Sequence, residues 1–343
     1  MFDGTPGIEG AMDTAAGLPG LPAPPPLGAS ALPAGTFDGS LVLVTGGGTG
    51  LGRAVAAEFA RLGADLLIVS RRERHLAPAR RELAKLGTRV SSAVCDIRDP
   101  RRIAEVFDRH PLPDVLVNNA AANFPVPAEE MSPNAWQSVV DITLTGTFLM
   151  TREFGRRHLA AGTPGSVIDV GASYAWTGGP GFAHSAAAKA GVESLVRTLA
   201  VEWGPYGIQV NGLVPGLMPH PDMTDDIRGN LARARDPAAH PVEHASEHAA
   251  DHAAEPAAKD ASGGPERPED PRAPAGHDRR QPALRVGAPR ELGWAATFLA
   301  SPYARFITGH TLVVDGANWQ RRGLVSPPVT PVREQLGRGP FTG

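Results

Sequence analysis

The chain has 343 residues, of which 42% are hydrophobic and 6% aromatic, so it suits one or two domains with a mostly aliphatic core. A formal net charge of -3 argues against nucleic acid or an anionic membrane as a partner. The single cysteine, Cys95, excludes an internal disulfide and a thiolate metal cluster and suits a reducing compartment. The first residues are acidic where a signal peptide is basic, and no run reaches about 18 apolar residues. We therefore expect a soluble, cytoplasmic protein.

Strands and helices alternate along the first half of the chain after a segment of low complexity. Residues 1–36 are mostly Ala, Gly and Pro, and they predict a disordered arm because they bury too little surface to offset the entropy of ordering. Apolar runs then predict strands at 41–45, 65–70, 89–96 and 114–120. Helical periodicity between these runs predicts helices at 50–62, 71–87 and 100–110, the second of them irregular at Pro78.

The same alternation continues in the second half of the chain. Long helices are expected at 132–159, where Ser132 and Pro133 suit a helix start, and at 182–203. Apolar runs predict three further strands, within 165–173, 207–216 and 310–316. Helical periodicity predicts one short helix within 283–302. This pattern predicts an α/β fold, a single Rossmann-type doubly wound parallel sheet of seven strands with helices on both faces.

Two further segments of biased composition flank or interrupt this domain. Residues 236–283 contain hardly an aliphatic side chain larger than Ala, so we expect a disordered insertion there. Residues 321–343, which contain several Pro and Arg, are expected to form a tail. The catalytic domain then comprises 37–235 and 284–320. Histidines recur every fourth residue in the insertion, at His240, His244, His248 and His252. On a helix they would share one face and bind Zn²⁺ or Ni²⁺, but nearby prolines and the lack of an apolar face favour a solvated segment without a metal site.

A glycine-rich turn between the first strand and the first helix predicts a dinucleotide site. Glycines let the backbone approach a pyrophosphate, and the following helix N-terminus offers free N–H groups. The alternative is a tight turn without a ligand. The predicted cofactor contacts in this turn are Thr45, Gly46, Gly48, Thr49, Gly50, Leu51 and Gly52.

Charged residues after the second and third strands indicate which dinucleotide binds. Arg71 and Arg72 stand where an enzyme that prefers NAD carries an acidic residue, so we predict NADP(H), with a 2′-phosphate bound by arginine. The alternative is that both are solvated residues at a helix start. Asp96 and Ile97 end the third strand and are predicted to contact the adenine, whereas a helix cap is the alternative for Asp96.

Several motifs in a fixed order resemble the short-chain dehydrogenase/reductase family. They lie at 45–52, 118–121, 210–216 and 306–319, together with Lys189 in its helix. The resemblance implies further cofactor contacts from Asn118, Ala120, Lys189, Pro215 and Gly216. It also implies that Asn119 braces the backbone, although either asparagine suits a simple turn. Family members are commonly tetramers built on the two long helices, so a homo-oligomer is expected.

The catalytic tyrosine of that family is not at its usual position. The family places Tyr four residues before the lysine, where this chain has Ser185, and its usual serine is replaced by Ala172. One branch, the mitochondrial-type 2,4-dienoyl-CoA reductases, carries Tyr 15 residues before the lysine and Ser four before it. This chain has Tyr174 at that place, and it also resembles the branch at 118–136 and 141–148. A tyrosine that only packs is the alternative for Tyr174.

This resemblance implies an NADPH-dependent reductase of 2,4-dienoyl-CoA or related unsaturated acyl-CoA thioesters in fatty acid degradation. Hydride goes to the δ carbon, and Tyr174 hydrogen-bonds the thioester oxygen of the dienolate. Lys189 holds the ribose, Ser185 is a supporting polar group, and Asn123 and Phe124 contact the substrate. The branch carries Asn where this chain has Thr145, which is then expected to act as a shorter second donor to the thioester oxygen.

Two other functions remain compatible with the same residues. One is reduction or oxidation of another carbonyl substrate, with Tyr174 as the acid. The other is a dinucleotide-binding protein without catalysis, which Thr145 and Ala172 favour slightly and Lys189 disfavours.

Overall fold

A parallel sheet of seven strands forms the centre of the molecule. The computed structural model describes residues 21–223, 281–320 and 331–338. Its strands run in the order β3-β2-β1-β4-β5-β6-β7, and every neighbouring pair is parallel. Their bounds are β1 (Leu41–Thr45), β2 (Asp65–Ser70), β3 (Val90–Val94), β4 (Val115–Asn118), β5 (Gly165–Val170), β6 (Ile208–Pro215) and β7 (Thr311–Val314). The predicted seven-stranded α/β fold is confirmed, and its strand order reverses between β1 and β4, where such sheets bind ligands.

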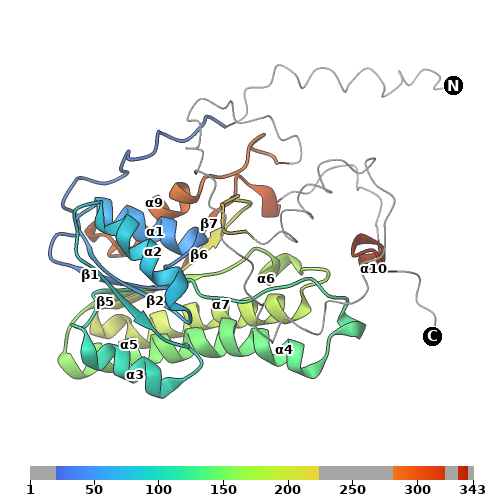
Figure 1. The fold of residues 1–343 in the computed structure, drawn as a ribbon, viewed down its shortest axis with the longest axis horizontal. Coiled ribbons are helices and arrows are strands. Elements are labelled where there is room, and N and C mark those ends of the chain that lie inside the picture. Colours follow the sequence, from blue (N-terminus) through green and yellow to red (C-terminus); the bar gives the residue numbers. More distant parts are fainter. Residues whose placement is uncertain (1–20, 224–280, 321–330, 339–343) are drawn as a thin grey trace.

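Helices cover both faces of this sheet. Figure 1 shows α1 (Gly50–Arg61), α2 (Glu73–Ala84) and α9 (Pro289–Ala300) above the sheet. Below it lie α3 (Pro100–Arg109), α4 (Pro133–Val140), α5 (Gly146–Ala161) and α7 (Ala183–Trp203). Alternate strand residues feed two hydrophobic clusters, since Val42 and Val44 pack toward α1 and α9 and Leu43 packs toward α5 and α7. Burial on both faces explains why β1, β2 and β4 are continuous apolar runs.

The long helix predicted at 132–159 forms with an interruption. The Ser132 side chain accepts a hydrogen bond from the Ala135 amide (3.1 Å), as its expected capping role requires. After α4 the chain makes a π-helical turn, Asp141–Thr145, before α5 begins at Gly146. A wider turn of this kind changes which side chains face the sheet, and such turns are frequent at functional sites.

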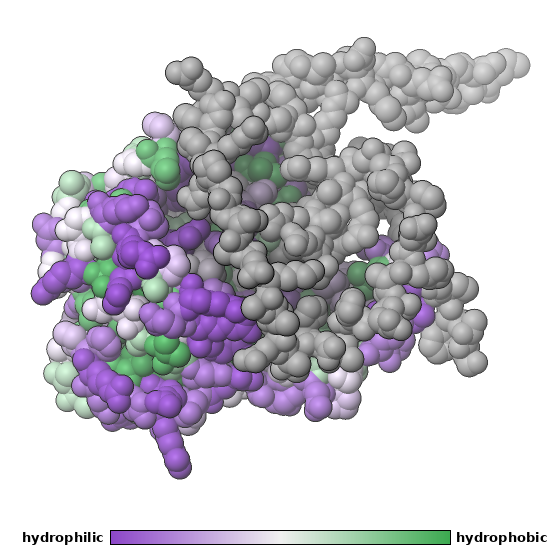
Figure 2. Space-filling model, viewed as in Figure 1, coloured by the Kyte–Doolittle hydropathy of each residue, from purple (hydrophilic) through white to green (hydrophobic). Residues whose placement is uncertain are grey.

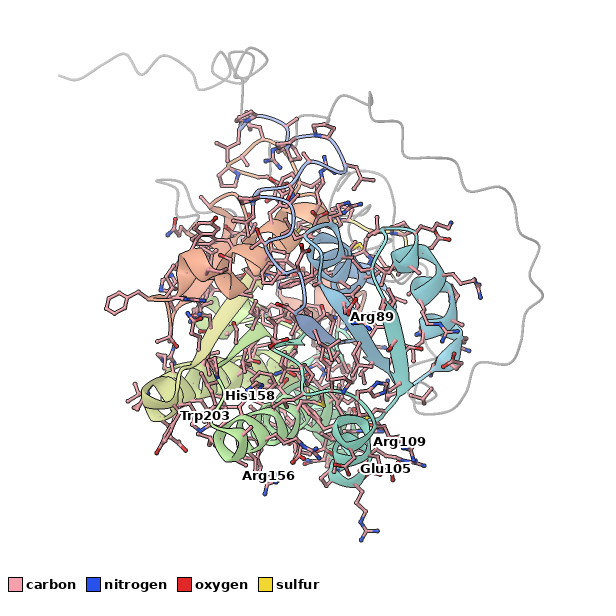
Figure 3. The ribbon with its side chains drawn as sticks, turned by 90° about the vertical axis from the view of Figure 1, so that its left-hand side faces the viewer. Arg89, Glu105, Arg109, Arg156, His158 and Trp203 are labelled. Carbon is pink, nitrogen blue, oxygen red and sulfur yellow. The ribbon has the colours of Figure 1, made fainter. Side chains whose placement is uncertain are left out.

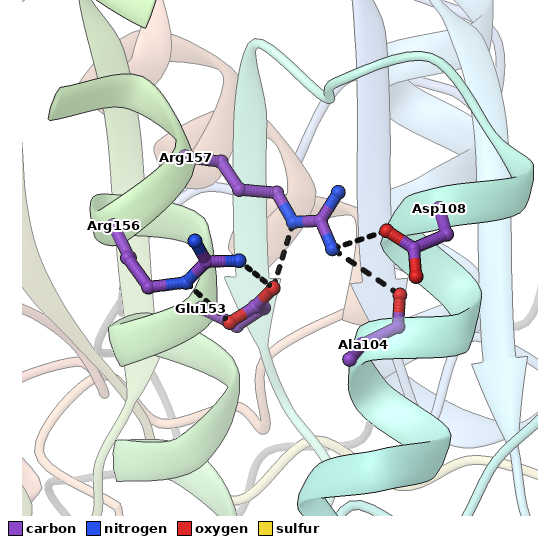
Figure 4. Close-up of polar contacts among 5 residues, drawn as sticks. All are labelled: Ala104, Asp108, Glu153, Arg156 and Arg157. Atoms are coloured by element: carbon purple, nitrogen blue, oxygen red, sulfur yellow. Dashed lines mark hydrogen bonds and ion pairs between the residues drawn. The ribbon is translucent and has the colours of Figure 1, made fainter. Parts of the chain in front are cut away.

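A charged cluster joins α5 to α3. Glu153 accepts hydrogen bonds from Arg156 (2.7 Å) and Arg157 (2.7 Å), and Arg157 also donates to Asp108 (2.7 Å) and to the Ala104 carbonyl (3.3 Å) of α3 (Figure 4). Glu153 is largely buried. The guanidinium of Arg157 therefore links two helices and compensates a carboxylate removed from water.

The inner sides of α5 and α7 meet in close contact. His158 of α5 hydrogen-bonds the Pro113 carbonyl through Nε2 (2.9 Å), and Trp203 of α7 packs over Gly155 (Figure 3). A β carbon at Gly155 would lie 2.5 Å from the Trp203 ring. The outer surface is different in character, since hydrophilic side chains cover most of the face that Figure 2 shows for the described residues.

The structure differs from two expectations about irregular segments. The helix α2 continues through Pro78 without a break. Residues 21–36, expected to be disordered, instead lie along α9, which donates from Arg290 to the Pro25 carbonyl (3.0 Å) and from Trp294 to the Ala29 carbonyl (3.1 Å). Composition gave no sign of this contact because the acceptors are backbone carbonyls.

Parts of the predicted arm, insertion and tail lie outside the described residues. This holds for 1–20, for 224–280 with its four spaced histidines, and for 321–330 and 339–343. Within the described tail, Arg333 of the short helix α10 (Val332–Gln335) pairs with Glu129 and Glu130, each at 2.9 Å. No helix in the described ranges is long and apolar enough to cross a membrane. The domain boundaries stay predictions.

Candidate active site

A cavity of about 330 Å³ lies at the carboxyl ends of the central strands. It opens beside β1 and β4, at the point where the strand order reverses. The predicted cofactor residues that line it are Gly46, Thr49, Gly50, Leu51, Arg71, Asp96, Ile97 and Ala120. Residues that the sequence did not single out for the cofactor also line it, among them Ser70, Ile142 and His220.

The glycine-rich turn is held from below by Asn119 and Thr45. Gly46 and Gly50 have φ of +65° and +52°, a region that favours glycine. The Asn119 amide donates to the Thr45 carbonyl (3.1 Å), and the Thr45 hydroxyl accepts from the Asn119 N–H (3.0 Å). Asn119 is thus a backbone brace, as expected. Thr45, Gly48 and Gly52 support the turn and do not line the cavity.

A carboxylate already occupies the anion-binding end of α1. Asp222 Oδ2 accepts from the Gly50 N–H (2.7 Å) and pairs with Arg53 (3.1 Å), and His220 of the same segment lies against Gly50. The sequence did not reveal this contact because 172 positions separate Gly50 from Asp222. The contact shows that this N–H group binds an oxyanion, which is what a pyrophosphate requires. The residues present therefore fit a dinucleotide.

The charged residues after β2 and β3 take different places. Arg71 lines the cavity, whereas Arg72 precedes α2 as its capping residue and lies outside the cavity lining. Asp96 is held by Arg98, whose Nη2 lies 2.6 Å from Oδ2, and this hydrogen bond lowers the pKa of the Asp96 carboxyl. The cap of α3 is Asp99, which accepts from the Arg101 amide (2.9 Å). Asp96 therefore lines the cavity, with its carboxylate bonded to Arg98, and is not a helix cap.

Three polar side chains converge next to the end of β5. Tyr174 begins the short helix α6 (Tyr174–Thr177), and its Oη lies 3.0 Å from the Ser185 hydroxyl of α7. Asn123 donates from Nδ2 to the same oxygen at 3.4 Å. The Tyr174 ring stacks on Phe182, with centroids 6.2 Å apart. Burial raises the pKa of Tyr174 and the Ser185 hydrogen bond opposes this rise, so the phenol stays protonated at neutral pH.

Lys189 lies one helical turn beyond Ser185 on α7. Its ammonium donates to the Val170 carbonyl at the end of β5, and the side chain is buried. Burial lowers the pKa of Lys189 to about 8, although Asp169 and Glu193 act in the opposite direction. Lys189 therefore lies at the carboxyl end of β5, one helical turn from the serine that bonds Tyr174.

Thr145 is not part of this cluster. It is exposed at the end of the π-helical turn, whereas Thr143, two positions earlier, is buried and accepts from the Ala122 amide (3.3 Å). Side chains two positions apart on a helix point to nearly opposite sides, so Thr145 faces away from the loop that carries Asn123. The expectation that Thr145 is the second donor is corrected, because Asn123 is the side chain that reaches Tyr174.

Other predicted residues lie near the site without lining the dinucleotide cavity. Asn118 is buried, and its Nδ2 donates to Thr151 (2.7 Å) and Asp169 (2.8 Å). Gly216 lines a separate cavity of about 660 Å³ beside β7, and Pro215 ends β6. Phe124 packs edge-on against His184, with ring centroids 4.7 Å apart. In the described part of the chain, no group of three or more His, Cys, Asp or Glu side chains suits a metal ion.

Comparison with known proteins identifies relatives over most of the chain. The family model described as short chain dehydrogenase matches residues 40–232, and one described as enoyl-(acyl carrier protein) reductase matches 253–317. A Bacillus subtilis protein named as a probable 2,4-dienoyl-CoA reductase is 34% identical over 284 residues, covering 81% of this chain and 96% of its own length. A Caenorhabditis elegans protein named in the same way is 42% identical over 54% of this chain, which spans only 62% of that relative.

Solved structures show the same architecture. A short chain dehydrogenase from Bacillus anthracis is 31% identical with a TM-score of 0.63, covering 81% of this chain and 96% of its own. A Beutenbergia cavernae protein solved with NADP at low occupancy is 29% identical with a TM-score of 0.67, covering 84% of this chain and all of its own. The fold, the lysine-centred cluster and these matches show that the chain belongs to the short-chain dehydrogenase/reductase family.

Proposed function

We propose that this protein is an NADPH-dependent reductase of 2,4-dienoyl-CoA or related unsaturated acyl-CoA thioesters. The observation that carries the proposal is the position of Asn123 and Ser185 on either side of the Tyr174 oxygen, at 3.4 and 3.0 Å. A tyrosine supported in this way replaces the one that most of the family places next to lysine. Relatives named 2,4-dienoyl-CoA reductase support the substrate class.

Tyr174 and Asn123 would act on the thioester oxygen of the substrate. When bound, NADPH supplies a hydride to the δ carbon of the dienoyl group. The Tyr174 hydroxyl and the Asn123 amide then donate hydrogen bonds to the oxygen on which charge develops, an arrangement of the oxyanion-hole type. Ser185 would donate to the tyrosine oxygen, which leaves the tyrosine proton for the substrate and fixes the orientation of the hydroxyl. The positive charge of Lys189 would favour the negative charge that develops on the thioester oxygen.

Residues around the dinucleotide cavity would select the cofactor. The Gly50 N–H would hold the pyrophosphate, and Arg71 at the cavity wall would pair with the 2′-phosphate that distinguishes NADPH from NADH. Asp96 would accept from the adenine amino group. Structures of relatives solved with NADP support this preference.

Assembly and location complete the proposal. We place the protein in the cytoplasm, in fatty acid degradation, as a homotetramer built on α4, α5 and α7. Trp136 and Phe148 on α4 and α5 support an interface there, since each exposes about two fifths of its surface.

Purified protein with NADPH and trans-2,trans-4-decadienoyl-CoA tests the reaction. We expect parallel loss of the dienoyl and NADPH absorbances. Tyr174→Phe should lower kcat about 10²- to 10³-fold and Asn123→Ala about 10- to 100-fold, as for the loss of an oxyanion donor. Thr145→Ala is the matched control and should keep kcat within about twofold. Full activity of Tyr174→Phe, or turnover on a ketone but not on the dienoyl thioester, would contradict the proposal.

A further inference from the structure

A buried polar cluster joins β4, β5 and α5. Asp169 of β5 is 1% exposed, and its Oδ1 accepts from Asn118 Nδ2 (2.8 Å), which also donates to Thr151 of α5 (2.7 Å). Asp169 Oδ2 is buried without a hydrogen-bond partner among the described residues. A buried carboxyl with one oxygen unpaired is costly, so its retention in the core calls for a compensating interaction.

Lys189 is positioned to supply that interaction. Asp169 and Leu116 share one side of the sheet with Val167, because alternate strand residues face the same way, and this side packs against α5 and α7. The carbonyl of the next residue on β5, Val170, accepts a hydrogen bond from the Lys189 ammonium. Asp169 thus directly precedes the residue that binds the Lys189 ammonium, and both side chains are buried in the interior, where charges are weakly screened.

Few other charges face this pair. On α7, Glu193 lies one turn after Lys189 and is buried; it accepts from the Thr311 hydroxyl (2.7 Å) and lies 3.6 Å from Arg197. From α6 the only titratable group is Tyr174, and α5 presents the uncharged Thr151. Asp169 is thus the acidic group that has no basic side chain bonded to it.

We propose that Asp169 is a positioning residue, the buried counter-charge that keeps Lys189 protonated and held at the end of β5 while the cofactor is bound. The expected effect on catalysis rests on the proposed function, whereas the effect of the Asp169 charge on the protonation of Lys189 does not depend on the substrate. Asn118 belongs to the same device, because its amide stabilises the charged form of Asp169.

The direction of the titrations agrees with this role. Burial lowers the pKa of Lys189 to about 8, and the charge of Asp169 is the first influence that opposes the fall. Burial raises the pKa of Asp169 to about 7, while the Asn118 hydrogen bond and the Lys189 charge lower it. Without the Asp169 carboxylate, less opposes the effect of burial on the pKa of Lys189. Lys189 should therefore lose its proton at a lower pH.

The test is Asp169→Asn, which removes the charge and keeps an oxygen to accept from Asn118. We expect the alkaline limb of the kcat/KM profile to move down by about one pH unit, the lower end of the range for a nearby opposite charge. At pH 8.5 this corresponds to a loss of up to about tenfold, whereas at pH 6 the variant should stay within about twofold of the parent. Thr151→Val is the matched control, since it removes the other hydrogen bond of Asn118 without changing a charge.

Binding of NADPH provides a readout that does not depend on the substrate. Titration of NADPH fluorescence from pH 6 to 9 should show the same downward shift in Asp169→Asn, so the inference is tested even if dienoyl thioesters are not reduced. If Asp169→Asn does not fold, Asn118→Ala should shift both profiles in the same direction, because it raises the pKa of Asp169 and neutralises the carboxyl. Alkaline limbs unchanged in a folded Asp169→Asn protein, or moved equally by Thr151→Val, would overturn the inference.

Discussion

Replacing Asp222 by Ala should tighten NADPH binding. In the structure its carboxylate accepts from the Gly50 N–H at 2.7 Å and pairs with Arg53 at 3.1 Å. The pyrophosphate of a bound dinucleotide would use the same N–H group at the start of α1. Cofactor and carboxylate therefore compete for one donor, and binding includes the cost of displacing Asp222.

The size of that cost follows from the contacts. A hydrogen bond to a charged acceptor contributes about 1.5–3 kcal/mol net, and a partly exposed ion pair adds about 0–1 kcal/mol. The side chains of Arg53 and Asp222 are 36% and 28% exposed, so we take the ion pair as negligible. Ordering of the Asp222 segment offsets a further part, which leaves about 1–2 kcal/mol. Asp222→Ala should thus lower the Kd for NADPH by about 5- to 30-fold.

Fluorescence titration of NADPH at pH 7 and two salt concentrations measures this effect. Asp222→Asn keeps an acceptor without the charge and should give an intermediate Kd. Glu105→Ala, on the outer side of α3, is the control for removing one surface carboxylate and should leave the Kd unchanged. An Asp222→Ala protein that binds NADPH as weakly as the parent, or more weakly, would refute the competition.

Three further predictions concern the cofactor and the stability of the fold. Arg71→Ala should raise KM for NADPH about tenfold or more and leave KM for NADH within about twofold, as measured by steady-state kinetics, because only NADPH has the 2′-phosphate. Gly155→Ala should destabilise the protein by about 1–3 kcal/mol in urea unfolding, since the added carbon would meet the Trp203 ring. Arg157→Ala should cost about 1–2 kcal/mol at pH 7 in the same assay. Hydrogen bonding by Arg156 and Arg157 lowers the folded pKa of Glu153 below 4.5, so this loss should shrink as the pH falls below that value.

Local sequence patterns predicted most of the framework. The runs at 41–45 and 65–70 coincide with β1 and β2 because buried parallel strands need apolar side chains on both faces. Ser132-Pro133 located the start of α4, since capping chemistry is local. The π-helical turn at Asp141–Thr145 had no such signal, because neither a glycine nor a proline marks it.

Contacts between residues far apart in the sequence were predicted only where those residues belong to a known motif. Tyr174 and Ser185, which the motif grouped with Lys189, are in contact; all three residues lie within one stretch of 16 residues on α6 and α7. Asp222 at the glycine-rich turn left no pattern, since an acidic residue after β6 has no fixed spacing from Gly50.

Asn123 and Thr145 show why a motif position alone does not assign a role. Both lie in stretches that resemble the same branch of the family, and both side chains carry a hydrogen-bond donor. The decisive property is direction. The loop after β4 brings the Asn123 amide to 3.4 Å from the Tyr174 oxygen, whereas the π-helical turn that buries Thr143 directs Thr145 outward. Thr145 therefore takes no part in the contacts that hold Tyr174, so the substitution of Asn by Thr at 145 leaves these contacts of the proposed reductase intact.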